Sequence, residues 1–319
     1  MIYHFVLNPK SGRSKKQVQM EQQIIDACSK RQLSYHIYYT TERGDATNYV
    51  KEMVKKAPGE RQRFICVGGD GTINEIANSV PGNTDIEFGV IPNGSGNDFV
   101  RNFTNLNRFS SIEAQLDGEA ISLDLIKCND NYCVNMVNIG FDCSVVLETE
   151  KIRKIKFISP SISYILGVLV GFFKKFGTKM KLIFDNGDVI EGNLTLTAIG
   201  NGKFCGGGFK SAPLANLTDG IFDICIIKKV SRLQFISLVG AYKDGTYLDK
   251  PAAQKVIDYR RESHFRMKFE DERPICIDGE ITHASTMEFT IAPKSFSFVI
   301  PKGCQLRFPS KKKNQGFKK

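Results

Sequence analysis

Short apolar runs alternate with longer amphipathic stretches over the first third of the chain. The apolar runs have the length of β-strands, and the stretches between them repeat their apolar positions at helical spacing. The expected strands are residues 3–7, 35–39, 64–67 and 88–91. The expected helices pass through Val18–Ala27, Val50–Val54 and Ile73–Val80, and another begins at Asp98. This alternation predicts a parallel α/β sheet, in which ligands bind at the carboxyl ends of the strands.

Beyond about residue 122 the pattern becomes β-like, and many segments alternate apolar and polar positions. These segments are Leu123–Cys128, Tyr132–Ile139, Met180–Phe184, Val189–Ile199, Ile221–Lys228, Phe265–Phe269, Ile275–Asp278, Met287–Ala292 and Phe296–Ile300. The turns at 129–131 and 185–187 have the composition of hairpin turns. Two helical segments, Ser161–Phe176 and Leu233–Tyr242, interrupt the strands.

The predicted fold class is α/β plus all-β, in a chain of two domains. A three-layer α/β domain covers residues 1–122, and a last strand at about 296–308 returns to it. A β-sandwich domain covers residues 123–295. Residues 309–319 form a basic tail that we expect to be disordered.

The composition favours a polyanionic partner. The net charge is +10 and the pI is near 9.1, and such a field concentrates anions at the protein surface. The sequence has no zinc-finger spacing, no RRM-like or KH-like signature and no Trp, so we expect no nucleic acid partner. The preferred partner is an anionic membrane surface.

The cysteines and the apolar runs indicate a soluble protein of a reducing compartment. The nine cysteines include no C-x-x-C pair and are scattered through apolar runs, which is typical of small buried hydrophobes. The N-terminus lacks the pattern of a signal peptide. The longest apolar run, 158–173, falls short of the roughly 20 residues that span a bilayer. We expect a cytoplasmic protein.

A glycine-rich turn, Gly68-Gly69-Asp70-Gly71-Thr72, lies between an expected strand and an expected helix. Its glycines let the backbone approach a phosphate chain, and the N–H groups that open the helix can bind an anion. Asp70 could organise a Mg²⁺ on the phosphates. The turn is also compatible with a strand–turn–helix corner that binds nothing.

Two other loops have the same placement. Residues 92–98 (P-N-G-S-G-N-D) follow the next strand, although Asn97 could simply cap a helix there. Asn8-Pro9-Lys10-Ser11-Gly12 follows the first strand and adds a cation. Glycine-rich loops on adjacent strands of one sheet favour phosphate binding. The chain contains neither G-x-x-x-x-G-K-[ST] nor G-x-G-x-x-G, which removes the main support for a P-loop or a dinucleotide fingerprint.

As a set, these motifs resemble the diacylglycerol kinase catalytic-domain family in its soluble bacterial form. The resemblance rests on G-G-D-G-T at 68–72 with Asn74-Glu75, on P-N-G-S-G-N-D-F at 92–99, and on N-P-x-S-G at 8–12. The second-domain motifs follow in the family's order: Gly200-Asn201-Gly202, Gly206-Gly207-Gly208, Ala212-Pro213, Thr218-Asp219-Gly220 and Asp278-Gly279-Glu280. The resemblance covers roughly residues 1–308, whereas G-G-D-G alone is shared with NAD kinases and phosphofructokinases.

The resemblance implies an NAD kinase/diacylglycerol kinase-like fold with ATP in a cleft between the two domains. With the loops described above, it assigns one set of residues to ATP. They are Asn8, Pro9, Lys10, Ser11, Gly12, Thr41, Gly68, Gly69, Asp70, Gly71, Thr72, Ile73, Asn74, Asn93, Gly94, Ser95 and Asn97.

The resemblance also implies the metal and the catalytic groups. A structural Mg²⁺ would be held by the Asp219 side chain and the backbone carbonyls of Asn216 and Ile221, and such oxygen ligands suit Mg²⁺. Without the family, residues 217–220 are a plain turn. Glu280 would be the base that takes the proton from a lipid hydroxyl, and Asp278 would orient it or help to hold the catalytic Mg²⁺. Two acids one residue apart are, by themselves, usually a polar turn.

The segment 161–176 is apolar and lies between two groups of lysines and arginines. It fits a surface that presses against anionic lipid, and it equally fits a helix packed on the sandwich with solvated lysines at its ends.

The function predicted is an ATP- and Mg²⁺-dependent lipid kinase that phosphorylates diacylglycerol to phosphatidic acid, as in phospholipid biosynthesis, at the inner face of the membrane. The alternatives are a kinase of another lipid (sphingosine, ceramide, a polyprenol or another glycerolipid) and an NAD kinase-like enzyme. A nucleotide-dependent membrane-binding regulator is the alternative that is not an enzyme. Members of the family are often dimers, so the resemblance allows a homodimer.

Overall fold

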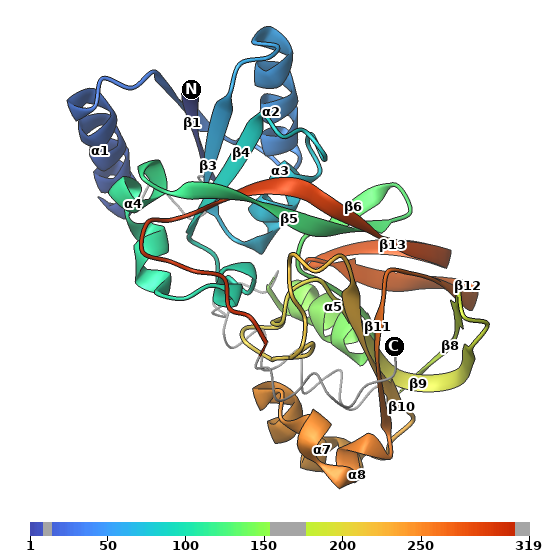
Figure 1. Cartoon of the computed structure of the whole chain (residues 1–319). Coiled ribbons are helices and arrows are strands. Elements are labelled where there is room, and N and C mark those ends of the chain that lie inside the picture. Colours follow the sequence, from blue (N-terminus) through green and yellow to red (C-terminus); the bar gives the residue numbers. More distant parts are fainter. Residues whose placement is uncertain (9–14, 154–176, 310–319) are drawn as a thin grey trace. The chain divides into compact units, whose positions relative to one another are not determined.

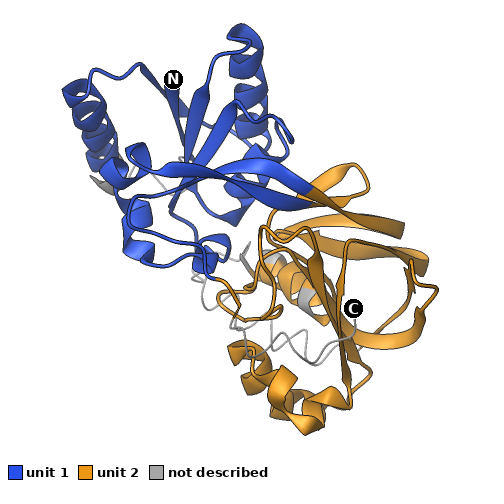
Figure 2. Cartoon of the chain, viewed as in Figure 1, with its two compact units in different colours: residues 1–125, 293–307 blue, residues 126–292, 308–319 orange. Residues whose placement is uncertain are grey.

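The structure is a computed structural model that describes residues 1–8, 15–153 and 177–309. It has two compact units (Figure 2): Met1–Leu125 with Pro293–Arg307, and Ile126–Ala292 with the residues after Arg307. The chain enters unit 2 within strand β5 (Glu119–Cys128) and returns to unit 1 within strand β13 (Glu280–Ile300). The predictions for residues 9–12, for the helix 161–176 and for the tail from residue 310 onward lie outside the described residues.

Unit 1 is built on parallel strands (Figure 1). They are β1 (Ile2–Leu7), β2 (Tyr35–Tyr39), β3 (Gln62–Gly68) and β4 (Ile86–Pro92). Their order is β4-β3-β1-β2, and the end of β13 pairs in parallel with β4 through Phe298 and Phe88. The helices are α1 (Lys15–Lys30), α2 (Asp45–Lys56), α3 (Asp70–Ala77) and α4 (Ile112–Leu116), and the 3₁₀-helices are η2 (Phe99–Asn102) and η3 (Leu106–Ser110).

Alternation along the strands of unit 1 buries both faces of the sheet. On one face, Phe5 and Ile65 pack with Ile24 of α1 and Leu116 of α4. On the other face, the His4 ring stacks on Phe64 with centroids 4.4 Å apart and lies edge-on to Tyr49 of α2. Burial lowers the pKa of His4 to about 4, so the ring is neutral in the core. Side chains alternate along a strand, so odd-numbered residues such as Phe5 and Ile65 lie on one face and even-numbered residues such as His4 and Phe64 lie on the other. These contacts confirm the predicted α/β class.

A buried ion pair joins β3 and β4. Arg63 and Glu87 are register partners, and Arg63 Nε donates to Glu87 Oε2 at 2.8 Å. Both side chains are almost fully buried, with 8% and 2% exposure. Arg63 Nη1 also donates to the carbonyls of Gln115 and Leu116, at 3.0 and 3.1 Å. The guanidinium therefore fixes the end of α4 onto the sheet.

We predict that Glu87→Gln lowers the free energy of unfolding by about 3 kcal/mol, because it leaves a buried guanidinium without its counter-charge. Urea denaturation followed by circular dichroism measures the change. Lys56→Ala is the control: it removes the exposed pair with Glu52 and should cost less than about 0.5 kcal/mol. An unchanged midpoint for Glu87→Gln would mean that the carbonyls of Gln115 and Leu116 satisfy Arg63 without Glu87.

Unit 2 is largely antiparallel sheet. Besides parts of β5 and β13, its strands are β6 (Asn131–Cys133), β7 (Met136–Gly140), β8 (Thr178–Phe184), β9 (Val189–Gly200), β10 (Phe222–Lys228), β11 (Ile257–Glu262) and β12 (His264–Ile277). Its helices are α5 (Phe141–Arg153), α7 (Arg232–Asp244), α8 (Pro251–Gln254) and the 3₁₀-helix η4 (Tyr247–Asp249). The predicted hairpins at 129–131 and 185–187 join β5 to β6 and β8 to β9.

Two long strands give unit 2 its sandwich character. β9 pairs with β8 over residues 189–194 and with β7 over 196–200. β12 likewise pairs with β8 at its start and with β7 at its end. The core between these pairings includes Phe184, Phe222, Phe265 and Phe289.

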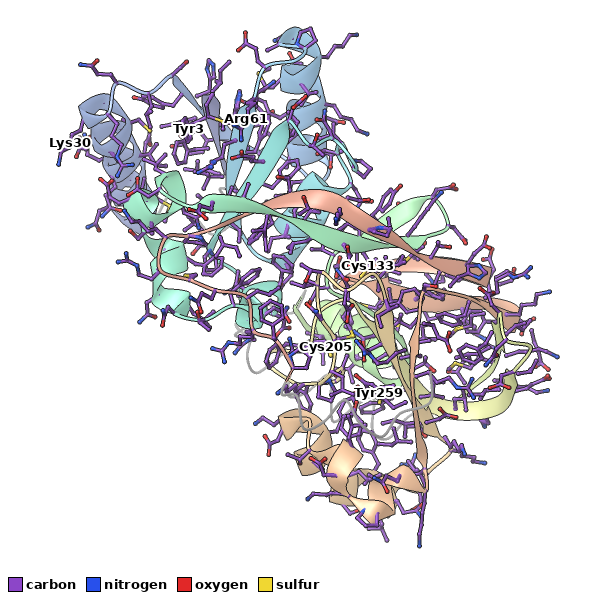
Figure 3. The ribbon with its side chains drawn as sticks, in the orientation of Figure 1. Tyr3, Lys30, Arg61, Cys133, Cys205 and Tyr259 are labelled. Carbon is purple, nitrogen blue, oxygen red and sulfur yellow. The ribbon has the colours of Figure 1, made fainter. Side chains whose placement is uncertain are left out.

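A second apolar cluster lies where the helices of unit 2 cover the sheet, and it includes Leu238, Tyr247 and Tyr259. Cys205 belongs to this cluster, and Cys133 belongs to the core between the strands (Figure 3). All nine cysteines are free and buried, which confirms their prediction as buried hydrophobes.

Several predicted boundaries were wrong. The segments 265–269 and 275–277 belong to one strand, β12, which ends before the predicted Asp278, and 287–292 and 296–300 both belong to β13. β12 continues through the polar residues 270–273, where the register with β13 shifts. The helix predicted from Asp98 is a pair of short 3₁₀-helices, η2 and η3. Helix α5 and strand β11 were not predicted.

His264, at the start of β12, links two carboxylates of unit 2. Its Nε2 lies 2.9 Å from Glu288 of β13, and its Nδ1 lies 2.6 Å from Asp185 of the β8–β9 turn. The hydrogen bond to Glu288 is the main cause that raises the pKa of His264 above its ordinary value of 6.5. Protonated His264 therefore holds the β8–β9 turn to β13.

The raised pKa predicts a pH-dependent stability. A folded-state pKa above the unfolded value stabilises the protein below the unfolded pKa, and this stability is lost as the pH rises through the folded pKa. The thermal midpoint should therefore fall as the pH rises above about 6.5, with a smaller fall in His264→Gln. His283→Gln, at an exposed position of β13, is the control and should keep the wild-type slope. Equal slopes for His264→Gln and wild type would exclude His264 as the source.

Candidate active site

The strand order of unit 1 locates a ligand crevice. In the order β4-β3-β1-β2 the chain adds β2 on one side of β1 and then β3 on the other. Ligands of open parallel sheets bind outside the carboxyl ends of the strands at such a reversal. The reversal lies between β1 and β3, and the loops that follow these strands begin at Asn8 and Gly69. The Asn8 N–H donates to the carbonyl of Val67 at 3.2 Å, which ties the two strand ends together.

Glycine is required where the β3 and β4 loops meet. A Cβ on Gly94 would lie 2.7 Å from the Cα of Gly69 and 2.9 Å from Asn97 Oδ1. A Cβ on Gly68 would lie 2.3 Å from Thr72 Oγ1. The Asn93 N–H donates to the Gly68 carbonyl at 2.8 Å, which holds the loops together. The backbones of the two predicted phosphate loops are therefore in contact.

Asp70 and Asn97 fix the shape of these loops. The Asp70 carboxylate accepts the backbone N–H groups of Asp98 and Phe99, each at 3.2 Å. Asn97 has a φ of 48°, and its side chain accepts from the Gly94 N–H and donates to the Gly94 carbonyl. Asn97 does not cap the following helix, because the N-cap residue of η2 is Asp98. Both side chains therefore act on the backbone of the loops.

Thr41 lies after β2, and it is bonded to its own chain segment. Its N–H and its hydroxyl both donate to Asp45 Oδ2, at 2.8 and 3.1 Å. Tyr38 donates to the other oxygen of Asp45. The structure therefore brings Asn8, residues 68–74 and residues 93–97 of the predicted ATP set to the carboxyl edge of one sheet, with Thr41 at the neighbouring strand.

We predict that Gly94→Ala weakens ATP binding by about tenfold or more, because the added methyl group must displace the backbone at Gly69. Titration calorimetry with ATP measures the effect. Gly240→Ala, in α7, is the matched control because a Cβ there meets no atom within 4 Å. Wild-type ATP affinity in a folded Gly94→Ala protein would count against phosphate binding by these loops.

In unit 2, Asp278 and Gly279 form the two-residue turn that joins β12 to β13. Their φ angles are 49° and 91°, the pattern of a type I′ hairpin turn, which Asp-Gly favours. Ile277 pairs with Glu280 across the turn. Glu280 is therefore the first residue of β13 and is held by strand pairing, with its side chain partly exposed.

The Asp278 carboxylate gathers the chain segment between β6 and β7. It accepts the N–H groups of Val134, Asn135 and Met136 at 2.6, 2.9 and 2.9 Å. The Cys133 thiol also lies 3.3 Å from Oδ1, and burial together with the Asp278 charge holds the pKa of this thiol well above its ordinary value. With both oxygens engaged, Asp278 is suited to position the turn that carries Glu280.

Two asparagines near this turn were not assigned to the site from the sequence, although Asn201 belongs to one of the motifs. Asn135 Nδ2 donates to the Phe204 carbonyl at 2.8 Å, and the N–H groups of Asn201 and Gly202 donate to the Asn135 carbonyl at 3.0 Å. Asn201 Nδ2 donates to the Val134 carbonyl at 2.8 Å. These bonds tie the Gly200-Asn201-Gly202 motif to the segment that Asp278 holds. Asn135 could have been found as a polar residue that interrupts an apolar run.

The predicted metal loop holds its carboxylate against a cation of the protein. Asp219 Oδ2 accepts from Arg261 Nη2 at 2.6 Å, and Arg261 Nε lies 3.3 Å from Asp223 Oδ1. Asp223 is fully buried, and this burial raises its pKa to about 7 against the opposing effect of Arg261. Among the residues that the structure describes, no group of three or more His, Cys, Asp and Glu side chains could hold a metal ion.

The donors at this loop still fit the predicted Mg²⁺ in kind. Asp219 supplies a carboxylate, and Asn216 and Ile221 supply carbonyls, which are the hard ligands that Mg²⁺ takes. Beside this loop, Arg261 and a hydrogen bond from Tyr259 lower the pKa of Asp223 against the larger effect of burial. Arg261 would have to share Asp219 with the ion.

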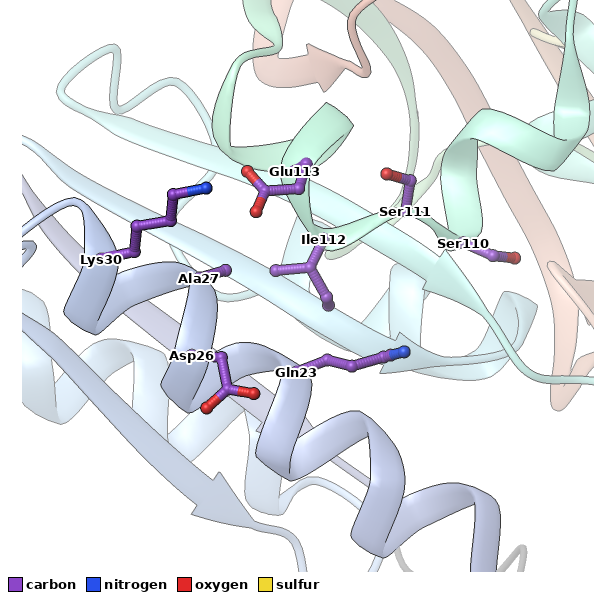
Figure 4. A pocket seen from close by; sticks show the side chains of 8 residues that line it. All are labelled: Gln23, Asp26, Ala27, Lys30, Ser110, Ser111, Ile112 and Glu113. Atoms are coloured by element: carbon purple, nitrogen blue, oxygen red, sulfur yellow. The ribbon is translucent and has the colours of Figure 1, made fainter.

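A surface pocket of unit 1 lies apart from the loops at the carboxyl ends of β1, β3 and β4, which we call the rim loops (Figure 4). It has a volume of about 340 Å³ and lies between α1 and the segment that joins η3 to α4. Its lining residues are Gln23, Asp26, Ala27, Lys30, Ser110, Ser111, Ile112 and Glu113. The α1 residues come from the second half of the helix, which runs back toward the amino ends of the strands. The pocket is therefore not part of the candidate site.

No helix among the described residues is long and apolar enough to cross a bilayer.

Comparison with known proteins gives matches along nearly the whole chain. The family model described as "Diacylglycerol kinase catalytic domain" matches residues 3–128. The family model described as "YegS C-terminal NAD kinase beta sandwich-like domain" matches residues 135–300. These two matches agree with the predicted resemblance and with the predicted pairing of an α/β domain with a sandwich.

Two curated relatives are similar over their full lengths. A "Probable lipid kinase YegS-like" protein of Shewanella frigidimarina is 26% identical over 313 residues, which are 95% of this chain and 96% of that protein. The "Diacylglycerol kinase" of Bacillus subtilis is 26% identical over 302 residues, 93% of this chain and 95% of that protein. A crystal structure described as a diacylglycerol kinase from Bacillus anthracis has a TM-score of 0.66 at 21% identity, and the match covers 94% of this chain and 97% of that one. At that identity the structural likeness shows the fold alone.

Proposed function

Because this chain belongs to the family of lipid kinases with a diacylglycerol kinase catalytic domain and a YegS C-terminal domain, we propose that its acceptor is diacylglycerol. The chain is thus a kinase with ATP as phosphoryl donor, and the proposed product is phosphatidic acid. The observation that carries the assignment of the base is the Asp278 turn, in which three backbone N–H groups fix Asp278, two residues before Glu280.

In the proposed reaction, Glu280 takes the proton from the lipid hydroxyl. The hydroxyl oxygen forms a bond to the γ-phosphorus of ATP, and the bond from that phosphorus to the β,γ-bridging oxygen breaks, leaving its electron pair on ADP. A carboxylate at the first position of a strand suits this role. Strand pairing with Ile277 holds its backbone, while the partly exposed side chain can reach a substrate.

The rim of unit 1 is the proposed binding site for the ATP phosphates. The glycine contact between the β3 and β4 loops brings backbone close to a ligand without side chains in the way. Asp70 and Asn97 keep these loops in one shape, so little ordering remains to be done when ATP binds. The start of α3 at Asp70 adds N–H groups that favour an anion.

Magnesium belongs to the proposal at two places. Bound with ATP, Mg²⁺ neutralises charge that develops on the phosphates. Asp70 is the carboxylate of the glycine-rich turn that we propose approaches this ion. The structural ion would be held by Asp219 and the carbonyls of Asn216 and Ile221. A lipid acceptor also implies that the protein works at a membrane surface, on the cytoplasmic side.

We predict that Glu280→Gln lowers kcat for diacylglycerol phosphorylation by about 10²- to 10⁴-fold, because the amide cannot accept the proton. The assay follows radiolabelled phosphate from ATP into lipid in mixed micelles with Mg²⁺. ATP affinity should stay near the wild-type value, since the base does not belong to the phosphate loops. Glu272→Gln, an exposed glutamate of β12, is the matched control and should keep full activity.

The same assay with other acceptors tests the substrate. Wild-type transfer to sphingosine, ceramide or a polyprenol, with diacylglycerol untouched, would replace the proposed substrate and leave the kinase class intact. Transfer to NAD alone would overturn the assignment to lipids. Undiminished activity of Glu280→Gln would remove Glu280 from its role as base.

A further inference from the structure

Two exposed large apolar side chains lie close together on one helix of unit 2. Leu233 of α7 is 80% exposed, and Ile236 of α7 is 58% exposed. The other exposed large apolar side chains of the described residues lie singly on other segments, at Met1, Val18, Val189 and Phe308. An apolar pair at helical spacing is a candidate interaction surface, whereas single exposed apolar residues are normal.

Helix α7 is firmly fixed to unit 2 through its opposite side. Leu238, Ala241 and Tyr242 are buried in the apolar cluster beneath it, and Phe235 packs edge-on against Phe141 with ring centroids 4.8 Å apart. A capping box between Ser231 and Gln234 defines its first turn. Because the buried side is anchored in this way, Leu233 and Ile236 cannot turn inward without unpacking the helix.

The exposed side of α7 forms a continuous stripe with cations beside it. At 100° per residue, Leu233, Ile236 and Gly240 fall on one side of the helix. An added Cβ on Gly240 would meet no atom of the described residues within 4 Å, so the surface is open at that position. Arg232 in the first turn and Lys243 in the last turn fall beside Ile236 on the same side. We call these five residues the α7 face.

The surroundings of the α7 face are also basic. From Lys228 to Val256 the sequence has six basic and two acidic side chains. The exposed lysines are Lys228, Lys229, Lys243, Lys250 and Lys255. Helices α7 and α8 lie together at one end of unit 2 (Figure 1), so the lysines of these helices belong to the same end of the unit as the apolar stripe. The charge of this region favours a negatively charged partner.

We propose that the α7 face docks the protein on an anionic lipid bilayer. Leu233 and Ile236 would enter the boundary between headgroups and acyl chains, while the surrounding lysines lie at the level of the lipid phosphates. A second copy of the chain fits this surface less well, because two identical basic faces would repel each other. The proposal rests on the proposed function in one respect, since docking would bring a lipid kinase to its substrate in the bilayer. The docking itself requires neither ATP nor a lipid acceptor.

The test is sedimentation with vesicles in the absence of ATP and of diacylglycerol. Vesicles of phosphatidylcholine with phosphatidylglycerol are compared with vesicles of phosphatidylcholine alone. We expect Leu233→Ser/Ile236→Ser to lower the partition coefficient on the anionic vesicles by about tenfold or more. We expect Lys229→Gln/Lys243→Gln to lower it by about fivefold for each cation removed. The thermal midpoint of unfolding should stay at the wild-type value in both variants.

Matched controls come from the same unit. Val189→Ser removes an exposed apolar side chain from β9, and Arg266→Gln/Lys268→Gln removes two exposed cations from β12. Both should bind anionic vesicles like the wild type. Activity on a short-chain diacylglycerol dissolved as monomers should be unchanged in Leu233→Ser/Ile236→Ser, and activity on diacylglycerol embedded in vesicles should fall. This pair of assays separates a failure of docking from a failure of the proposed catalysis.

Three results would overturn the proposal. Equal vesicle binding by wild type and Leu233→Ser/Ile236→Ser would show that the α7 face does not carry the docking. A clear fall in the thermal midpoint of that variant would show that the face is covered in the folded protein. A dimer that dissociates in the variant during sedimentation velocity, with vesicle binding unchanged, would assign the face to a second copy of the chain.

Discussion

The geometry of unit 2 depends on one buried carboxylate that receives three consecutive backbone N–H groups. Asp278 sits in a left-handed conformation at the tip of the β12–β13 hairpin, and Val134, Asn135 and Met136 converge on it. Apart from the bonds of Asp278, β7 is paired with the end of β12 only through residues 137–139 and 275–277. A carboxylate accepts several N–H donors where an amide side chain would present its own N–H groups to some of them. Strand β13 therefore begins two residues after a side chain whose hydrogen bonds require a carboxylate.

Unit 1 uses the same physical device on a different fold. Asp70 receives the N–H groups of Asp98 and Phe99, and so it joins the loop after β3 to the loop after β4. At Gly69 and Gly94 the two loops approach so closely that a Cβ on Gly94 would lie 2.7 Å from the Cα of Gly69. In both units an aspartate that the motifs assign to chemistry is also required to hold a loop. A loss of activity on replacing Asp70 or Asp278 would thus not by itself distinguish catalysis from architecture.

The sequence predicted the elements whose patterns are local and missed those that depend on tertiary contacts. The parallel strands of unit 1 are short apolar runs buried on both sides, and they were predicted with boundaries within two residues. The predictions that divided β12 and β13 into two strands each were wrong, because polar residues interrupt the apolar pattern of both strands. Pro293–Ser295 looked like a break, yet β13 continues through Lys294 in a left-handed conformation, with its N–H bonded to Asp124. Strand β11 was missed because its charged residues, such as Arg260 and Arg261, hide the alternation of Ile257 and Tyr259.

The candidate site divides in the same way. Glycines and the Asp-Gly turn could be predicted because special backbone angles and close approaches leave a mark on residue type. Asn135 and Asn201 could be noticed in the sequence, as a polar residue in an apolar run and as part of a motif, but their partners could not be predicted because these hydrogen bonds exist only in the folded chain. At the predicted metal loop, the motif could be identified but the charged neighbours of its carboxylate could not. Its motif names Asp219, but Arg261 and the buried Asp223, which share its electrostatics, come from a neighbouring strand and from beyond the motif. Any cation at that loop must therefore compete with a guanidinium that no reading of the loop alone reveals.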